Sequence, residues 1–391
     1  MNIRFSRRHF LQQTIALAAG APLAASLAPR ELLAADAPAQ PSRKFDPRVA
    51  IVQCRTYTPD EVRTSMDKAF DSLGGLSSLV KNKTVTVKLN LTGTDFTPFL
   101  DRPVGETYMT HYNTASALAA ALFSAGATRV RFVESTQSKS TLETTLGWAD
   151  WDVKALKALG KVEFENTRNL GNGKSYAHLK VPGNGYVFSS LDLNHSYEDT
   201  DVMVSLAKLK NHITAGVTLS MKNLFGLTPN SLYGDQAGNE DATAGRGPLH
   251  NPKGFENVRL PGLKEGITSI EPTWRVPRIL VDVCTARPIH LAIIDGITSM
   301  SGGEGPWCGG AAKLKVTTPG LIIAGLNPVC TDAVGTAVMG YENIRASRGA
   351  RPFDFCDNHL LLAEQAGLGS ADLTKIDVRG LSIEKARYPY G

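Results

Sequence analysis

Three lysines, one histidine and two asparagines follow an apolar run at residues 201–206. In an open parallel sheet, ligands bind beyond the carboxyl ends of the strands, and a helix that starts there offers free backbone N–H groups to an anion. The stretch therefore predicts a site for a small anionic ligand. Its polar residues are Lys208, Lys210, Asn211, His212, Lys222 and Asn223.

Lys222 and His212 are the first candidates for catalytic residues. The positive charges of neighbouring lysines would lower the pKa of Lys222, so that it could act as a base, a nucleophile or a covalent cofactor handle. The alternative is an ordinary anion-binding or surface lysine. A neutral His212 could serve as an acid, a base or a metal ligand, or it could be structural.

Other polar residues are predicted to reach the same crevice. Lys208, Lys210 and Asn223 would bind the ligand, as would Lys88 and Asn90, which end an earlier strand at residues 84–91. Lysines together with carboxylates suit a ligand that bears a carboxylate or a phosphate group, with or without a divalent metal.

The acidic candidates lie later in the chain. Asp295 ends an apolar strand at residues 291–294, where a buried carboxylate needs a cation, a metal or a helix terminus as its partner. We expect Asp295 to be catalytic or to ligate a metal, together with Glu304 and His250. Asp332 could serve the site or pair with a helix dipole.

Strands and helices alternate along the chain, which predicts an α/β fold with a mostly parallel central sheet and helices on both faces. The expected strands are residues 49–54, 84–91, 129–133, 201–206, 291–294 and 321–324. The expected helices include residues 60–73, 113–125, 328–339 and 359–366.

One large domain at residues 49–391 is expected, preceded by a polar lead-in at residues 38–48. Short strands at residues 162–191 predict a small antiparallel flap. Residues 228–266 form a long loop rich in Gly, Asn and Pro, which is typical of a functional lid.

The chain starts with a segment typical of a twin-arginine signal peptide at residues 1–37, with Arg7 and Arg8 before an apolar run. We therefore expect the twin-arginine machinery to export the protein to the periplasm. The alternative is a membrane anchor; after cleavage we expect no stable membrane span. Cleavage would remove four arginines and two acidic residues, which lowers the formal net charge from +5 to +3. Without a basic patch, nucleic acid is not an expected partner.

Several motifs resemble those of the domain-of-unknown-function family numbered 362. They are Lys-Leu-Lys-Asn-His at residues 208–212, Thr-Leu-Ser-Met-Lys-Asn-Leu-Phe-Gly at residues 218–226, Asp-Gly-Ile at residues 295–297, Gly-Glu-Gly-Pro at residues 303–306 and Asn-Pro at residues 327–328. Some members of that family carry an iron–sulfur module. The five cysteines of this chain include no closely spaced pair, so we expect no iron–sulfur cluster.

His212, Gly216 and Lys222 also form His-x3-Gly-x5-Lys, which is similar to a stretch of the nickel-pincer lactate racemases. In those enzymes the lysine holds the cofactor covalently, so this resemblance implies a racemase or an epimerase. Three hypotheses stay open: an enzyme that acts on a small anionic metabolite, a binding protein without catalysis, and a pincer-cofactor racemase or epimerase.

Overall fold

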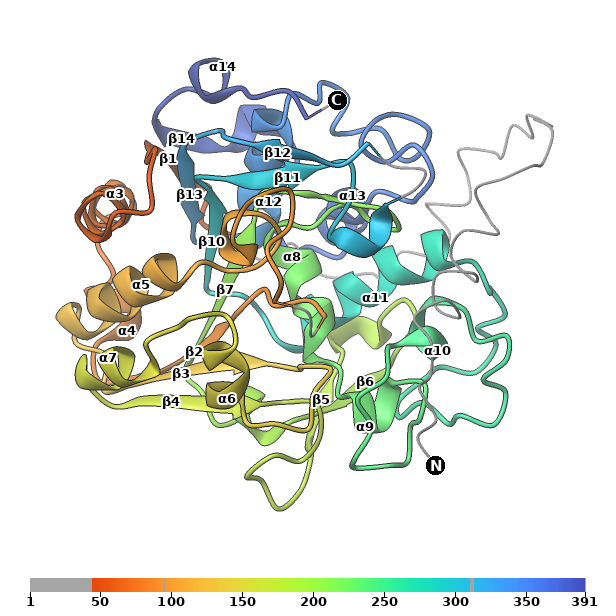
Figure 1. Cartoon of the computed structure of the whole chain (residues 1–391). Helices are drawn as coiled ribbons and strands as arrows, with labels where there is room; N and C mark the ends of the chain where they lie inside the picture. Colours follow the sequence, from red (N-terminus) through yellow and green to blue (C-terminus); the bar gives the residue numbers. More distant parts are fainter. Residues whose placement is uncertain (1–43, 94–95, 310–312, 391) are drawn as a thin grey trace.

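The structure is a computed structural model that describes residues 44–93, 96–309 and 313–390 (Figure 1). The expected signal peptide and residues 38–43 of the lead-in lie outside this part of the chain. Within it, no helix combines the length and the apolar character that crossing a membrane requires.

The core of the molecule is an eight-stranded sheet in the order β14-β1-β13-β10-β7-β2-β3-β4. β13 runs antiparallel to both β1 and β10, and every other neighbouring pair is parallel. This confirms the predicted mostly parallel sheet. The strands are β1 (Arg48–Gln53), β2 (Thr84–Lys88), β3 (Arg129–Glu134), β4 (Val162–Asn166), β7 (Val202–Lys208), β10 (Leu291–Gly296), β13 (Leu321–Gly325) and β14 (Asp377–Gly380).

The three strands β7, β10 and β13 are buried along their whole length. Apolar residues fill these strands because helices cover both faces of the sheet, as is usual for parallel strands. A polar side chain at the end of such a strand therefore enters the protein at the carboxyl edge of the sheet.

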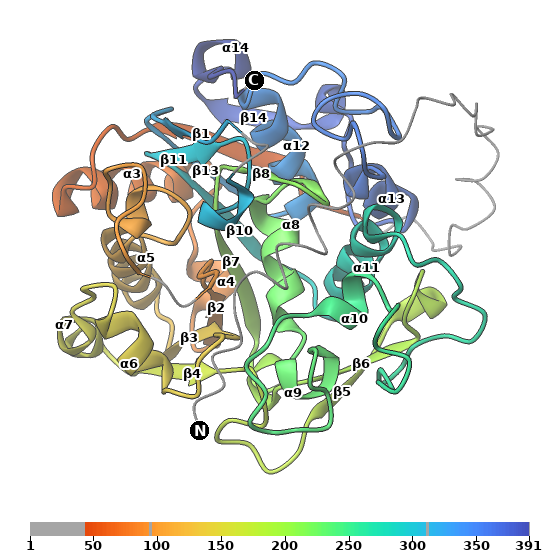
Figure 2. The same ribbon diagram turned by 45° about the vertical axis from the view of Figure 1, so that its right-hand side comes forward.

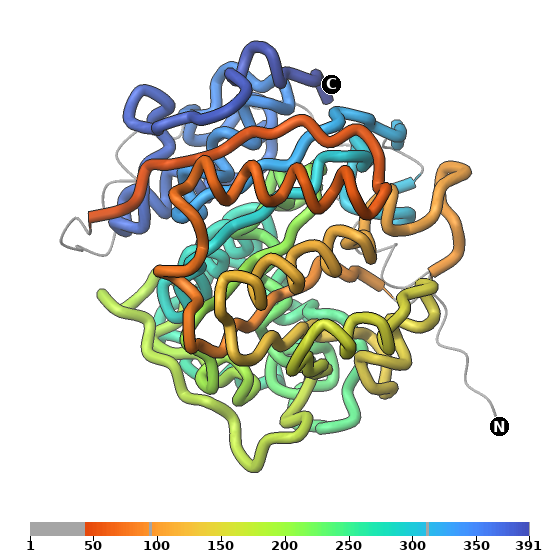
Figure 3. Tube along the Cα trace, turned by 90° about the vertical axis from the view of Figure 1, so that its left-hand side faces the viewer, coloured from red at the N-terminus to blue at the C-terminus, as the bar shows by residue number. Residues whose placement is uncertain are grey.

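One face is covered by α3 (Pro59–Ser72), α4 (Ser77–Val80), α5 (Tyr112–Ser124), α6 (Leu142–Gly147) and α7 (Val153–Ala158) (Figures 1 and 3). α3 is amphipathic: Val62, Met66, Ala69 and Phe70 recur on one helical face and are buried. Figure 3 shows α3 and α5 side by side over the sheet.

The opposite face is covered by α8 (Leu219–Asn223), α11 (Pro272–Ala286), α12 (Pro328–Val338) and α13 (His359–Gln365) (Figure 2). Each face has its own apolar core. The remaining helices are α9 (Asn230–Tyr233), α10 (Gly247–His250), α14 (Ile383–Ala386) and the 3-10 turns η1 (Val104–Glu106), η2 (Pro182–Asn184), η3 (His195–Tyr197), η4 (Leu224–Leu227), η5 (Pro306–Cys308) and η6 (Leu373–Lys375).

Three two-stranded antiparallel sheets lie outside the central one. They are β5 (Ala177–Lys180) with β6 (Ser190–Leu193), β8 (Asn211–His212) with β9 (Gly216–Val217), and β11 (Ser299–Ser301) with β12 (Lys315–Thr317). β5 and β6 form the second part of the expected flap. β4, its expected first strand, instead extends the central sheet in parallel beside β3, because Val162 and Phe164 face the apolar core.

The segment at residues 228–266 is less irregular than expected. It contains α9 and α10, and Tyr233, Leu249 and Leu260 are buried in the core. These apolar anchors pack the segment onto the face that holds α8 and α11 (Figure 2).

Candidate functional site

Two buried ion pairs lie at the carboxyl edge of the sheet. The Nζ atom of Lys88, at the end of β2, is 2.6 Å from Oε1 of Glu134, at the end of β3. The Nζ atom of Lys208, at the end of β7, is 3.3 Å from Oδ2 of Asp295, which lies opposite it on β10. The four strands are neighbours in the order β3-β2-β7-β10, as the sequence analysis expected of a continuous sheet.

Other residues of the protein supply hydrogen-bond partners for both members of the Lys208–Asp295 ion pair. Nζ of Lys208 also donates to the hydroxyl of Tyr57 (2.8 Å) and the carbonyl of Thr298 (2.7 Å). Asp295 accepts hydrogen bonds from Tyr57 (2.9 Å) and Thr114 (3.1 Å). These contacts describe a structural pair, so the catalytic and metal-binding roles of Asp295 stay predictions without geometric support.

Lys88 belongs to a second satisfied network. Its Nζ donates to the carbonyl of Leu89 (2.7 Å). The side-chain amide of Asn223 donates to the carbonyl of Lys88 (3.1 Å) and accepts from Nδ2 of Asn90 (3.0 Å). Lys88, Asn90 and Asn223 thus lie together as predicted, but their polar groups form hydrogen bonds mainly with one another. Oδ1 of Asn90 is buried and has no hydrogen-bond partner among the described residues.

Lys210 and Glu304 are also brought together. Nζ of Lys210 donates to the carbonyls of Tyr108 (2.6 Å) and Glu304 (2.9 Å). Burial lowers the pKa of Lys210 to about 7, against the opposing charge of Glu304. The Glu304 carboxylate accepts from the backbone of Ile213 (3.0 Å) and the indole of Trp307 (3.2 Å). These contacts hold the loop that carries Glu304 and Trp307 beside the β8–β9 hairpin.

Lys222 differs from the other three lysines. Its Nζ lies 4.7 Å from the ring centre of Phe225, and within the described residues it makes no hydrogen bond and no ion pair. Burial lowers the pKa of Lys222 to about 8; the charge of Glu304 opposes this shift, and those of Arg246 and Lys88 add to it. The side chain is partly exposed. Lys222 therefore presents a free amine at the site.

Three histidines lie close enough to Lys222 for its charge to act on them: His212 of β8, His250 of α10 and His359 of α13. The charge of Lys222 is among the causes that lower the pKa of each, after burial, which is the largest cause. The pKa falls to about 4 for His250, to about 3 for His359 and well below its ordinary value for His212. All three imidazoles are therefore neutral near pH 7.

Hydrogen bonds assign opposite tautomers to His212 and His250. The backbone N–H of Thr214 donates to Nδ1 of His212 (3.1 Å), so the proton of the neutral ring is on Nε2. Nδ1 of His250 is 2.8 Å from the carbonyl oxygen of Arg246, which only accepts, so this Nδ1 carries the proton and Nε2 has a lone pair. One ring is thus a donor at Nε2 and the other an acceptor.

Arg246, which the sequence pattern did not mark as a site residue, lies in the segment at residues 228–266, and its charge acts on Lys222. Its Nε donates to the carbonyl of Thr228 (2.8 Å), and its Nη2 donates to Oγ of Ser135 (2.7 Å). Nη1 of Arg246 has no hydrogen-bond partner among the described residues. Arg246 therefore has a donor left for a ligand. His359 was also missed, because at the start of an amphipathic helix nothing in its pattern marks it.

A tight hairpin carries the chain from β7 to α8. Gly216 has a φ of 75°, and a Cβ atom there would lie 2.7 Å from the carbonyl oxygen of Pro352. Only glycine fits this left-handed and crowded position without strain. The hairpin places His212 on one side of the turn and returns the chain to α8, which carries Lys222.

The start of α8 is occupied by the protein. Asp332 of α12 accepts hydrogen bonds from the backbone of Ser220 (2.9 Å) and Met221 (2.8 Å) and from the Ser220 hydroxyl (2.6 Å). Burial raises the pKa of Asp332 to about 7, although these bonds oppose the shift. The expectation that this helix start offers its N–H groups to a ligand is therefore wrong, because Asp332 uses them.

Within residues 44–93, 96–309 and 313–390, no group of three or more His, Cys, Asp or Glu side chains is arranged to hold a metal ion. Asp295, Glu304 and His250 are thus not brought together as a ligand set, and their metal-binding role stays a prediction. The racemase resemblance would place a cofactor on Lys222 itself, and that alternative stays a prediction. All five cysteines are free and buried.

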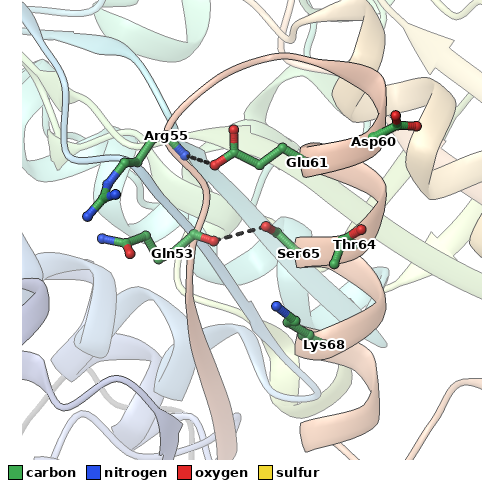
Figure 4. Close-up of a pocket in the computed structure, with 7 residues that line it drawn as sticks. All are labelled: Gln53, Arg55, Asp60, Glu61, Thr64, Ser65 and Lys68. Carbon is green, nitrogen blue, oxygen red and sulfur yellow. Dashed lines mark hydrogen bonds between the residues drawn. The ribbon is translucent and has the colours of Figure 1, made fainter.

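A surface pocket of about 400 Å³ lies elsewhere, between the end of β1 and α3 (Figure 4). Figure 4 shows Glu61 accepting from the backbone of Arg55, and Ser65 donating to the carbonyl of Gln53. None of the predicted site residues lines it. Its lining residues are Gln53, Arg55, Asp60, Glu61, Thr64, Ser65 and Lys68.

Comparisons with known proteins identify the family. No curated protein matches the chain significantly. A crystal structure of a Thermotoga maritima protein from a structural genomics consortium is 13% identical, with a TM-score of 0.33; the match covers 68% of this chain and 56% of that chain. The model of the domain of unknown function DUF362 matches residues 85–337, a range that contains Lys88, Lys222, His212 and Asp295. The chain therefore belongs to the DUF362 family.

Proposed function

We propose that the protein binds a small ligand bearing a carboxylate or a phosphate group at Lys222. One observation carries this proposal: Lys222 alone among the four candidate lysines has no hydrogen-bond or ion-pair partner in the described part of the chain. A largely buried cation is costly without a counter-charge, so the arrangement favours an anion as the missing partner.

The surrounding charges support an anionic ligand. Glu134 is already paired with Lys88, and Glu304 is held by the backbone of Ile213 and by Trp307. Arg246 adds a second positive charge close enough to lower the pKa of Lys222. The positive charge of the site is therefore not fully neutralised by the protein.

The two imidazoles support an enzyme over a binding protein without catalysis. His250 offers a lone pair that can accept a proton, and the neutral His212 offers an N–H that can donate a hydrogen bond to a substrate oxygen. We therefore propose an enzyme that acts on a small anionic metabolite, with Lys222 and His212 as catalytic residues.

Thermal unfolding with inorganic phosphate and with acetate tests anion binding. A ligand at a hundredfold excess over its Kd stabilises the folded state by about 2.7 kcal/mol. We expect at least one of the two anions to raise the Tm of the wild-type protein and of Lys154→Met, which changes an exposed lysine of α7. Lys222→Met should lose the shift. Sodium chloride at equal ionic strength separates binding from screening. Equal shifts in both variants would overturn the proposal.

We also propose export by the twin-arginine machinery to the periplasm, supported by Arg7 and Arg8 before an apolar run. Replacing both arginines with lysine should leave the precursor in the cytoplasm, as cell fractionation would measure. Efficient accumulation of that variant in the periplasm would contradict this route.

A further inference from the structure

We propose, on the basis of the anion site above, that Lys222 forms an imine with a small aldehyde or ketone that also carries a carboxylate group. The inference depends on the contrast among the lysines. Nζ atoms of Lys88, Lys208 and Lys210 each donate to backbone carbonyls. An amine held by these bonds is fixed against the backbone, whereas the amine of Lys222 makes no such bond among the described residues and can turn toward a substrate.

The aromatic ring of Phe225 organises the groups around this amine. Nζ of Lys222 lies 4.7 Å from its ring centre, and the imidazole of His250 contacts the same ring at a centroid distance of 5.1 Å in an edge-to-face arrangement. Lys222 and His250 therefore both contact the ring of Phe225. The cation–π contact with this ring favours the protonated amine, but burial has the larger effect and lowers the pKa of Lys222 to about 8, so a neutral, nucleophilic fraction is available near that pH.

A second, independent observation marks a place for a ligand. His359 is fully buried, and neither of its ring nitrogens makes a well-formed hydrogen bond with a described residue. After burial, the charge of Lys222 lowers its pKa and the nearby backbone of Ala215 opposes this shift. Buried polar atoms without partners are rare in folded proteins and call for an explanation. A polar ligand beside Lys222 would supply the missing partner.

The chemistry of imine formation balances with the groups present. The neutral amine adds to the carbonyl carbon, and the new C–N bond is accompanied by transfer of one amine proton to the carbonyl oxygen, which gives a carbinolamine. The C–O bond then breaks, and the oxygen leaves as water with the second amine proton. Nε2 of His250 can accept a proton from the amine and pass it to the oxygen, while the neutral His212 can donate a hydrogen bond from Nε2 to the carbonyl oxygen without losing its proton. Nothing is oxidised or reduced.

Arg246 defines the second part of the substrate. Its Nε and Nη2 atoms are held by Thr228 and Ser135, which fixes the plane of the guanidinium. Nη1, without a described partner, remains to donate to a carboxylate. The substrate class is therefore an oxo acid, in which a carbonyl and a carboxylate belong to one small molecule.

Reductive trapping tests this inference. The full-length mature protein is incubated near pH 8 with pyruvate or with glyoxylate, and sodium borohydride is added to convert an imine into a stable secondary amine. Intact-mass measurement and peptide mapping then locate the adduct. We expect one adduct per chain on Lys222 with at least one probe, no adduct in Lys222→Met, and an unchanged adduct in Lys154→Met.

The outcomes separate this inference from the anion site itself. If phosphate or acetate still raises the Tm through Lys222 but neither oxo acid is trapped, the imine is refuted and the anion site stands. If neither binding nor trapping occurs, both are refuted. Adducts spread equally over exposed lysines such as Lys154 would also overturn the inference. Peptide mapping of the wild-type protein keeps the test decisive even if Lys222→Met folds poorly.

Discussion

Lys222→Met is expected to make the ligand-free protein more stable. Burial lowers the pKa of Lys222 from 10.5 to about 8, so near pH 7 the folded state carries a charge that its surroundings disfavour. A pKa unit corresponds to about 1.4 kcal/mol, so removing the charge should raise the free energy of unfolding by up to about 3 kcal/mol. Water that reaches the partly exposed side chain reduces this gain.

The gain should depend on pH in a specific direction. Between pH 8 and 10.5 the unfolded chain holds a proton on Lys222 that the folded protein has released. Wild-type stability therefore rises with pH through this window relative to the variant. The advantage of Lys222→Met should be largest below pH 8 and should disappear toward pH 10.5.

Urea unfolding at several pH values measures this difference. Methionine keeps most of the apolar stem of lysine, so the packing against Phe225 should change little. Lys154→Met serves as the matched control, with a difference from wild type that does not vary across this window. A Lys222→Met variant that is less stable than wild type at pH 7, or whose advantage persists above pH 10.5, would refute the reasoning.

Three further predictions concern the supports of the site. Asp332→Asn should remove a pH dependence of the stability. The folded pKa of Asp332 is about 7 and the unfolded value is 3.8, so its contribution of about 4 kcal/mol is present below pH 4 and is lost as the pH rises through 7. Urea unfolding of the wild-type protein and the variant at several pH values would show this difference. Lys208→Met should lower the free energy of unfolding by about 3–5 kcal/mol, because it leaves the buried charge of Asp295 unpaired. The double variant with Asp295→Asn should recover part of this loss, as calorimetry would measure. A double variant less stable than Lys208→Met would contradict the structural role of the pair. Gly216→Ala should lower the free energy of unfolding by at least about 1 kcal/mol, because the backbone of residue 216 is left-handed. An unchanged Tm would contradict the inference that only glycine fits at this position of the hairpin.

Much of the fold was predictable because strong local patterns mark its elements. Apolar runs that end in a polar residue predicted the placement of Lys88, Lys208 and Asp295 at one sheet edge. Parallel neighbours follow from helices between strands, so the edge could be assembled before any contact was known. The reversed direction of β13 could not be predicted in this way, because its own apolar pattern is the same in either orientation.

Which lysine stays free could not be predicted from the sequence. Lys208 is paired with Asp295 and hydrogen-bonded to Tyr57, which are both distant in the chain, and Lys88 is paired with Glu134. Such pairing depends on strand order and on side-chain direction, which local patterns do not encode. Arg246 was missed for a similar reason, since an arginine in a glycine-rich segment is typically a solvated charge.

The free amine of Lys222 gives the site a thermodynamic character of its own. An anion that binds beside Lys222 would raise its pKa from about 8 back toward 10.5. At a pH between about 8 and 10.5, Lys222 of the complex therefore holds a proton that Lys222 of the free protein has released, so the anion and the proton bind together. The site therefore binds the anion together with a proton on Lys222, and its affinity should fall as the pH rises above about 8.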